Sequence, residues 1–214
     1  MKTNYVMDYE TLANCFIACF EDTKSEDQEV FVTHESKNDI LELVTFLEKN
    51  IAYGEWHVSF NGLSFDSQIT EHILRNKEQL LEQDGDTIAR FLYNKSQDII
   101  NRQNQGEFSE FSPRDLHIRQ LDVFKLNHWD NPAKRSSLKW IQYTMDWHNI
   151  MDMPIHHTTE VTADQIPEII KYCWNDVKST KQIMMLSKSN IDLRRKLTEE
   201  YGIDLYSASE PRIS

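Results

Sequence analysis

Two carboxylates, Asp8 and Glu10, stand two residues apart directly after the apolar residues 5–7. Residues i and i+2 of a β-strand point to the same face of a sheet, so the two side chains project side by side. Neighbouring carboxylates repel each other unless a proton or a cation lies between them. Oxygen donors of this kind suit Mg²⁺, and the pair is therefore a candidate metal site. The structural alternative is the polar outer face of an edge hairpin.

Two further stretches carry carboxylates. Asp66 follows a strand and turn at the predicted start of a helix, where it can be a simple helix cap. Tyr172 and Asp176 are four residues apart in a predicted helix, so a phenol and a carboxylate lie on the same helix face. Each stretch alone is also compatible with an ordinary structural role.

The order of the three stretches resembles the motifs of the DEDDy group of 3′→5′ exonucleases, which have a ribonuclease H-like fold. The motif sequences most resemble those of the proofreading exonuclease domain of family B DNA polymerases. Asp8-Tyr9-Glu10-Thr11 matches Asp-x-Glu-Thr, residues 61–66 match Asn-x-x-x-Phe-Asp, and residues 172–176 match Tyr-Cys-x-x-Asp. The matches span residues 8–176, which is most of the chain.

The resemblance implies a role for each matching residue. Asp8, Glu10, Asp66 and Asp176 would hold two Mg²⁺ or Mn²⁺ ions, and Tyr172 would orient the attacking water. Two such ions about 3.5–4 Å apart can activate a nucleophile and stabilise the leaving oxygen of a phosphodiester. A phenol with an ordinary pKa of about 10 is a poor general base, which favours a positioning role for the tyrosine.

Residues expected to contact the substrate are Thr11, Asn61, Phe65 and Lys139. Phe65 can line a cleft or pack in the core. Lys139 belongs to a basic cluster with Lys134 and Arg135, and the cluster adjoins Trp140. Such a cluster can hold a phosphate backbone while the tryptophan stacks on a base. The alternative is a solvated helix start.

Asp122 and the adjacent histidines His156 and His157 are further candidate residues. Asp122 follows an apolar residue on a predicted strand and is expected either to support the metal site from behind or to be a plain polar residue of a hairpin face. His156 and His157 suggest a metal pair, but adjacent residues seldom share a ligand direction. We therefore expect both histidines to be ordinary loop residues.

Length and charge bound the possible classes of protein. A chain of 214 residues fits one domain and can bury a sizeable core. The net charge of −12 argues against a broad electrostatic grip on nucleic acid. It leaves room for a narrow cleft in which metal ions carry the positive charge.

The sequence also carries expectations about its compartment. We expect no membrane span, because no apolar run is long enough, and there is no signal-peptide pattern. The three cysteines, an odd number in apolar settings, predict buried free thiols in a reducing environment: Cys15, Cys19 and Cys173. We expect a cytoplasmic protein, in the host cytoplasm if the source is viral.

The fold expected over residues 1–214 is a single α/β domain of ribonuclease H-like type, in which helices flank a mixed β-sheet. Strands are predicted at two places within 5–20 and at 30–33, 55–60 and 117–124. Helices are predicted at 38–50, 66–75, 136–145, 164–187 and 191–201. Residues 76–115 are expected to form a helical insertion. The chain is also expected to belong to a longer polymerase or replication protein.

The function expected from these features is metal-dependent 3′→5′ removal of nucleotides from the 3′ ends of single-stranded DNA, linked to proofreading or replication. An exonuclease that trims RNA is an alternative, because the same carboxylates serve both. Another alternative is a catalytically silent docking module of a replication assembly, against which the intact carboxylates argue. The expected partners are a single-stranded 3′ end and a polymerase module in the same longer chain.

Overall fold

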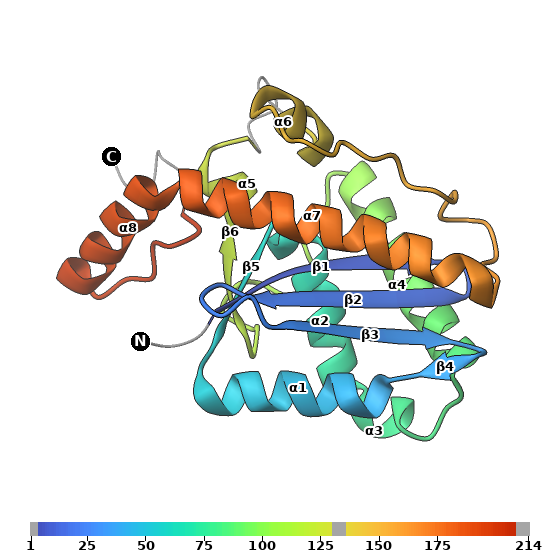
Figure 1. Ribbon diagram of the computed structural model, residues 1–214. Coiled ribbons are helices and arrows are strands. Elements are labelled where there is room, and N and C mark those ends of the chain that lie inside the picture. Colours follow the sequence, from blue (N-terminus) through green and yellow to red (C-terminus); the bar gives the residue numbers. More distant parts are fainter. Residues whose placement is uncertain (1–3, 130–135, 209–214) are drawn as a thin grey trace.

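The computed structural model describes residues 4–129 and 136–208. A single mixed sheet forms the centre of the fold (Figure 1). Its strands are β1 (Asn4–Leu12), β2 (Cys15–Asp22), β3 (Gln28–His34), β4 (Lys37–Asn38), β5 (Trp56–Ser59) and β6 (Arg119–Asp122). Their order is β4-β3-β2-β1-β5-β6. The pairs from β4 to β1 are antiparallel, and β5 lies parallel to both β1 and β6. Strand β1 is therefore central, and the alternative of an edge hairpin is wrong.

Helices cover both faces of this sheet (Figure 1). They are α1 (Ile40–Tyr53), α2 (Asp66–Arg75), α3 (Lys77–Leu80), α4 (Gly85–Asn104), α5 (Val123–Leu126), α6 (Leu138–Thr144), α7 (Ile166–Leu186) and α8 (Lys188–Tyr201), with short 3₁₀ turns η1 (Gly62–Ser64) and η2 (Ala163–Gln165). Helices α1, α2 and α4 pack on one face, and α7 runs across the other. The predicted α/β class, mixed sheet and flanking helices are confirmed. Gly202 ends α8 at a φ of 67°.

The alternation of side chains along β1 decides where the candidate site lies. Met7 and Tyr9 are buried in the apolar cluster that the sheet forms with α1, α2 and α4. Successive residues of a strand point to opposite faces. Asp8 and Glu10 are therefore directed to the face that α7 covers, and they lie in the middle of the sheet.

The expected insertion at residues 76–115 needs correction. The segment is helical, but α4 belongs to the core, because Ile88 and Leu92 are fully buried in the same cluster as β1 and α1. The helix also begins in tight contact with the sheet, since a Cβ added at Gly85 would lie 2.2 Å from the carbonyl oxygen of His34. Helical periodicity predicts the helix but carries no information on what it packs against.

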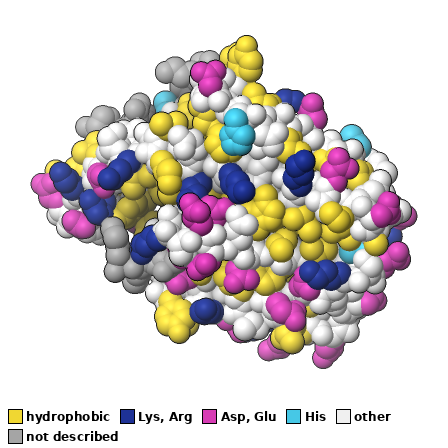
Figure 2. Space-filling model, in the orientation of Figure 1, with side chains coloured by type: hydrophobic (Ala, Val, Ile, Leu, Met, Phe, Trp, Pro, Cys, Tyr) yellow, Lys and Arg dark blue, Asp and Glu magenta, His cyan; other side chains and the backbone are white. Residues whose placement is uncertain are grey.

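The surface carries both signs of charge. On the face crossed by α7, Lys and Arg side chains are mixed with Asp, Glu and exposed apolar side chains (Figure 2). The described residues of that face thus offer no continuous basic surface to a nucleic acid. Among the helices of residues 4–129 and 136–208, none is long and apolar enough to cross a membrane.

The substitution Leu92→Ala tests whether α4 is part of the main hydrophobic core. Truncating this fully buried side chain should lower the free energy of unfolding by about 2–5 kcal/mol, because a cavity is left in the main core. Urea unfolding followed by circular dichroism should show one transition, shifted as a whole. Asn94→Ala, on the exposed face of the same helix, is the control and should change the midpoint little. Two separate transitions, with only one shifted, would mean that α4 is an appended unit.

Candidate metal centre

The candidate centre begins with Asp8 and Glu10 on β1 and Cys173 on α7. Their ligand atoms all lie within 4.8 Å of one another, and this group could hold a metal ion. The Cys173 thiol donates to the backbone carbonyl of Asp8 at 3.4 Å, and its sulfur lies 3.8 Å from Asp8 Oδ2. The thiol thus fixes α7 against the strand at the position of the two carboxylates.

A tight turn between β5 and α2 positions Asp66. Asn61 adopts the left-handed conformation with φ 61°, which Asn tolerates better than most residues. At Gly62 a Cβ would lie 1.9 Å from Ser59 Oγ, so no side chain fits there. Phe65 occupies the cap position of α2, and Asp66 is therefore not the helix cap. The backbone amides of Asp66 itself and of Tyr9 instead lower the pKa of its carboxyl and so partly offset the effect of burial.

Asp122 holds this turn from the neighbouring strand. Its buried carboxylate accepts hydrogen bonds from the amides of Asn61 at 3.0 Å, Leu63 at 3.1 Å and Phe124 at 3.0 Å. The expectation that Asp122 supports the site from behind therefore fits the geometry, and the support acts on the backbone that carries Asp66. A plain polar residue of a hairpin face would be exposed, whereas Asp122 is completely buried.

Tyr9 connects β1 to the first turn of α2. Its hydroxyl lies 2.8 Å from Thr70 Oγ1, and the Thr70 hydroxyl also lies within hydrogen-bond distance, 3.0 Å, of the Asp66 carbonyl oxygen. Because Tyr9 stands between Asp8 and Glu10 in the sequence, this contact fixes the spacing between the strand carboxylates and Asp66.

Helix α7 contributes Tyr172 and Asp176. The two side chains share one helix face, as predicted, and the charge of Asp176 raises the pKa of the Tyr172 phenol. Asp176 Oδ1 also accepts a bond of 2.9 Å from Gln142 Nε2, and the same amide nitrogen donates to Ser179 Oγ at 2.8 Å. Gln142 lies on α6 and is 1% exposed. No spacing in the sequence connects Gln142 to a motif, so its role is visible only in the structure.

The carboxylates destabilise one another's charged forms. Burial raises the pKa of Asp8 well above its usual range, and the nearby Glu10, Asp66 and Asp176 raise it further. Burial, followed by the charge of Asp176, likewise raises the pKa of Glu10. The pKa of Asp66 rises to about 7, mainly because the group is buried. A cluster of this kind favours a bound proton or a bound cation, so the donor set fits a divalent metal.

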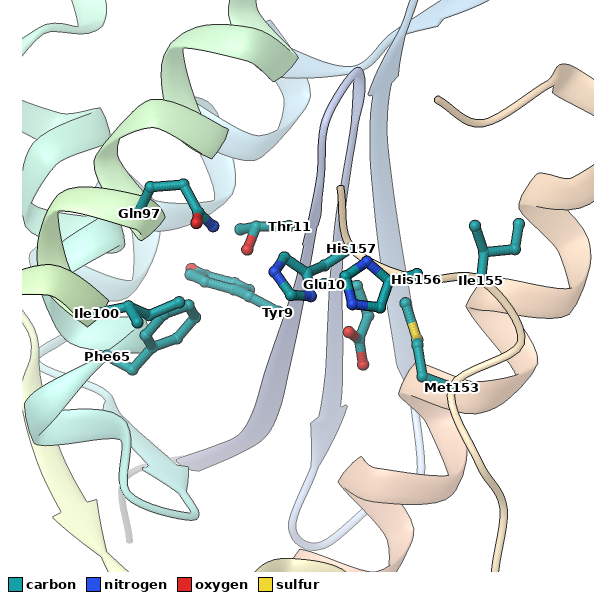
Figure 3. Close-up of a pocket in the computed structure, with 10 residues that line it drawn as sticks. All are labelled: Tyr9, Glu10, Thr11, Phe65, Gln97, Ile100, Met153, Ile155, His156 and His157. Carbon is teal, nitrogen blue, oxygen red and sulfur yellow. The ribbon is translucent and has the colours of Figure 1, made fainter. Parts of the chain in front are cut away.

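Two adjacent clefts open at the carboxylates. Asp8 and Asp66 line a cleft of about 390 Å³ together with Asn61. Glu10 and Thr11 line a second cleft of about 440 Å³ (Figure 3). Tyr9 and Phe65 line both clefts and stand between them.

Three of the four residues expected to bind substrate therefore line these clefts: Thr11, Asn61 and Phe65. Phe65 also packs against the core cluster, so both interpretations of this side chain apply.

Lys139 is placed differently from the other expected substrate residues. Its ammonium group pairs with Asp152 at the surface, and it is not among the residues that line either cleft. Lys134 and Arg135 lie outside the described residues. Trp140 is 58% exposed, and its ring stacks on that of Tyr143 with centroids 5.9 Å apart.

The structure places the cysteines and the histidine pair as the sequence predicts. The three cysteines are free and buried. His156 and His157 lie in a loop, as predicted, although both line the cleft of Glu10.

No family model matches this chain, and no curated protein is significantly similar to it. Function is therefore inferred from the site.

The electrostatic strain in the metal-free centre is tested by Asp66→Asn. With a pKa of about 7 against an ordinary 3.8, the folded state binds this proton more tightly than the unfolded state. Protonation of Asp66 therefore stabilises the folded state most below about pH 4, and this stabilisation is lost as the pH rises to about 7. With chelator present, Asp66→Asn should raise the melting temperature by several degrees at about pH 8 and by much less at about pH 4.

Adding Mn²⁺ should stabilise the wild-type protein more than Asp66→Asn, because the variant lacks one charged donor. Glu35→Gln, which changes an exposed carboxylate, is the control and should show neither effect. Equal shifts of Asp66→Asn at both pH values would contradict the assignment of strain to this carboxylate.

Proposed function

We propose that this protein is a metal-dependent 3′→5′ exonuclease of the DEDDy type, built on a ribonuclease H-like fold, that acts on the 3′ ends of single-stranded DNA. The observation that carries the proposal is the convergence of Asp8, Glu10, Asp66, Tyr172 and Asp176. These residues come from β1, the start of α2 and the middle of α7. Chance packing rarely buries so many carboxylates at one point, because each loses hydration and repels the others.

The four carboxylates are the proposed donors for two Mg²⁺ or Mn²⁺ ions. When bound, such ions supply the positive charge that a phosphodiester requires at its attacking and leaving oxygens. Cys173 lies in the same group, but burial raises the pKa of its thiol well above the usual range. The thiol therefore stays neutral, and the negative charge comes from Asp8, Glu10, Asp66 and Asp176.

Tyr172 is proposed to position the attacking water. Burial and the charge of Asp176 raise the pKa of its phenol, so the hydroxyl remains protonated at neutral pH and does not act as a base. Asp176, one helical turn further on, is the proposed acceptor that directs this hydroxyl. A fixed hydroxyl can hold water in an orientation suited to attack, which reduces the entropic cost of reaching the transition state.

The shape and charge of the site favour an unpaired end. The two clefts meet at Tyr9 and Phe65, and an aromatic ring such as Phe65 can stack on a base that is free of its complement. The described face in Figure 2 lacks the continuous basic surface that a duplex would contact. Binding is thus proposed to be local, over the few nucleotides next to the cut.

Asp8→Ala tests the proposal. Degradation of 5′-labelled linear single-stranded DNA should require Mg²⁺ or Mn²⁺, stop with chelator, and shorten the strand stepwise from its 3′ end. Asp8→Ala should reduce this rate by about 1000-fold or more, because it removes charge from the reacting centre. Glu35→Gln should keep the wild-type rate.

A circular strand of the same sequence should stay intact, because it offers no end. Cleavage of the circle, or a wild-type rate in Asp8→Ala, would refute the proposal. Matched RNA oligonucleotides decide between the DNA-directed activity and RNA trimming. A folded wild-type protein that degrades neither would favour the silent docking module.

Tyr172→Phe separates water positioning from metal binding. Removing only the hydroxyl should leave the stabilisation by Mn²⁺ unchanged, while single-turnover cleavage slows by about 10–100-fold. Asp176→Ala should slow it further and also weaken the Mn²⁺ effect, since a donor is lost. If Tyr172→Phe turns over at the wild-type rate beside an inactive Asp176→Ala, the tyrosine has no part in the mechanism.

A further inference from the structure

Helix α6 lies between a wall of one cleft and the helix that carries two of the site residues (Figure 1). Residues 136–138, at its start, line the cleft of Asp8 and Asp66. Its buried Ile141 belongs to the same apolar cluster as Cys173 of α7. The helix is therefore packed where it can connect the cleft wall to the metal centre.

Gln142 makes the polar contact between α6 and α7. Its side chain is almost completely buried, and its amide nitrogen carries two hydrogens. This nitrogen donates to Asp176 Oδ1 at 2.9 Å and to Ser179 Oγ at 2.8 Å. The Ser179 hydroxyl in turn donates to the backbone carbonyl oxygen of Asp176 at 3.1 Å. Both hydrogens of the amide are thus used, and turning the amide over would place its oxygen against the carboxylate.

These contacts hold the Asp176 carboxylate in one orientation. Asn175 Nδ2 donates to the same Oδ1 atom at 3.4 Å, so both amides contact Oδ1 and Oδ2 stays available to a metal ion. Asn175 is held in turn by a bond of 2.9 Å from Trp147 Nε1, shortly after α6. A carboxylate near three others is driven to turn away from them, because like charges repel. The two amide donors oppose that rotation.

We propose that Gln142 is a positioning residue of the metal centre. Its amide group holds Asp176 in the orientation that binds a metal ion, and it makes this orientation depend on how α6 packs against α7. The inference rests on the proposed function, because it takes Asp176 as a metal donor. Hydrogen bonds from groups behind the ligands commonly change metal affinity by about 10–100-fold.

Gln142→Met tests the inference, because it keeps the length of the side chain and removes the amide. Binding of Mn²⁺ is measured without nucleic acid by electron paramagnetic resonance, which detects free Mn²⁺. The dissociation constant should rise by about 10–100-fold. Gln142→Asn, whose amide is one methylene too short to reach Asp176, should give a similar loss.

Ser179→Ala is the matched control. It removes the second acceptor of the Gln142 amide and leaves the bond to Asp176, so the affinity for Mn²⁺ should stay close to the wild-type value. If Gln142 only packed α6 against α7, Ser179→Ala and Gln142→Met would change the affinity alike. That result would overturn the inference.

The dependence on α6 is tested by a double-mutant cycle. Ile141→Ala removes apolar contacts between α6 and α7 and no polar contact with a carboxylate. It should weaken Mn²⁺ binding when Gln142 is present and add little in Gln142→Met, since the connection is then already lost. Equal effects in both backgrounds would mean that α6 does not act through this amide.

Kinetics on single-stranded DNA separate this inference from the proposed function. In Gln142→Met at low Mn²⁺, kcat should fall by about 10–100-fold with KM nearly unchanged, and more Mn²⁺ should restore most of the rate. Wild-type Mn²⁺ affinity in Gln142→Met, beside DNA degradation by the wild type, would overturn the positioning role alone. Mn²⁺ binding that depends on Gln142, in a wild type that degrades no nucleic acid, would overturn the exonuclease and leave the positioning role.

Discussion

Mutual repulsion among Asp8, Glu10, Asp66 and Asp176 is the constraint on which the arrangement of the fold depends. Two of these carboxylates lie half-buried in the centre of the sheet, where reduced solvation strengthens the repulsion between like charges. The apolar clusters on both sheet faces bring the elements together and offset this cost. Hydrogen bonds then set the positions of the groups. Without a cation, the centre is a local source of instability inside an otherwise well-packed domain.

A buried ion pair outside the carboxylate cluster holds α7 against the sheet. Lys181 Nζ lies 2.6 Å from Glu21 Oε1 on β2 and also donates to the Asp22 carbonyl oxygen at 3.2 Å, and all three residues are buried. Buried ion pairs add little net stability, but they tolerate few alternative arrangements. We infer that this pair fixes the register of α7 along β2. Tyr172 and Asp176 lie about 2.5 and 1.4 turns earlier in the helix, and both thereby face β1.

Local patterns predicted the parts of the site that a single element determines. The i, i+2 spacing placed Asp8 and Glu10 on one strand face, and the i, i+4 spacing brought Tyr172 to Asp176. What depends on contacts between elements was not predictable in the same way. Gln142 reaches Asp176 from another helix, and the core role of α4 follows from the face it presents to the sheet. Because such partners lie far apart in the chain, spacing carries no signal for them.

The two clefts give the proposed reaction a direction. Asp8 and Asp66 face one cleft and Glu10 faces the other, so the reacting phosphate belongs at the boundary formed by Tyr9 and Phe65. The residues that line the two clefts differ in composition on the two sides of this boundary. The chain has a net charge of −12, so in the proposed reaction attraction to the strand would come from bound cations and stacking instead of from a basic surface. In that arrangement the same carboxylates control both metal binding and access of the nucleic acid, because without metal they repel the phosphate.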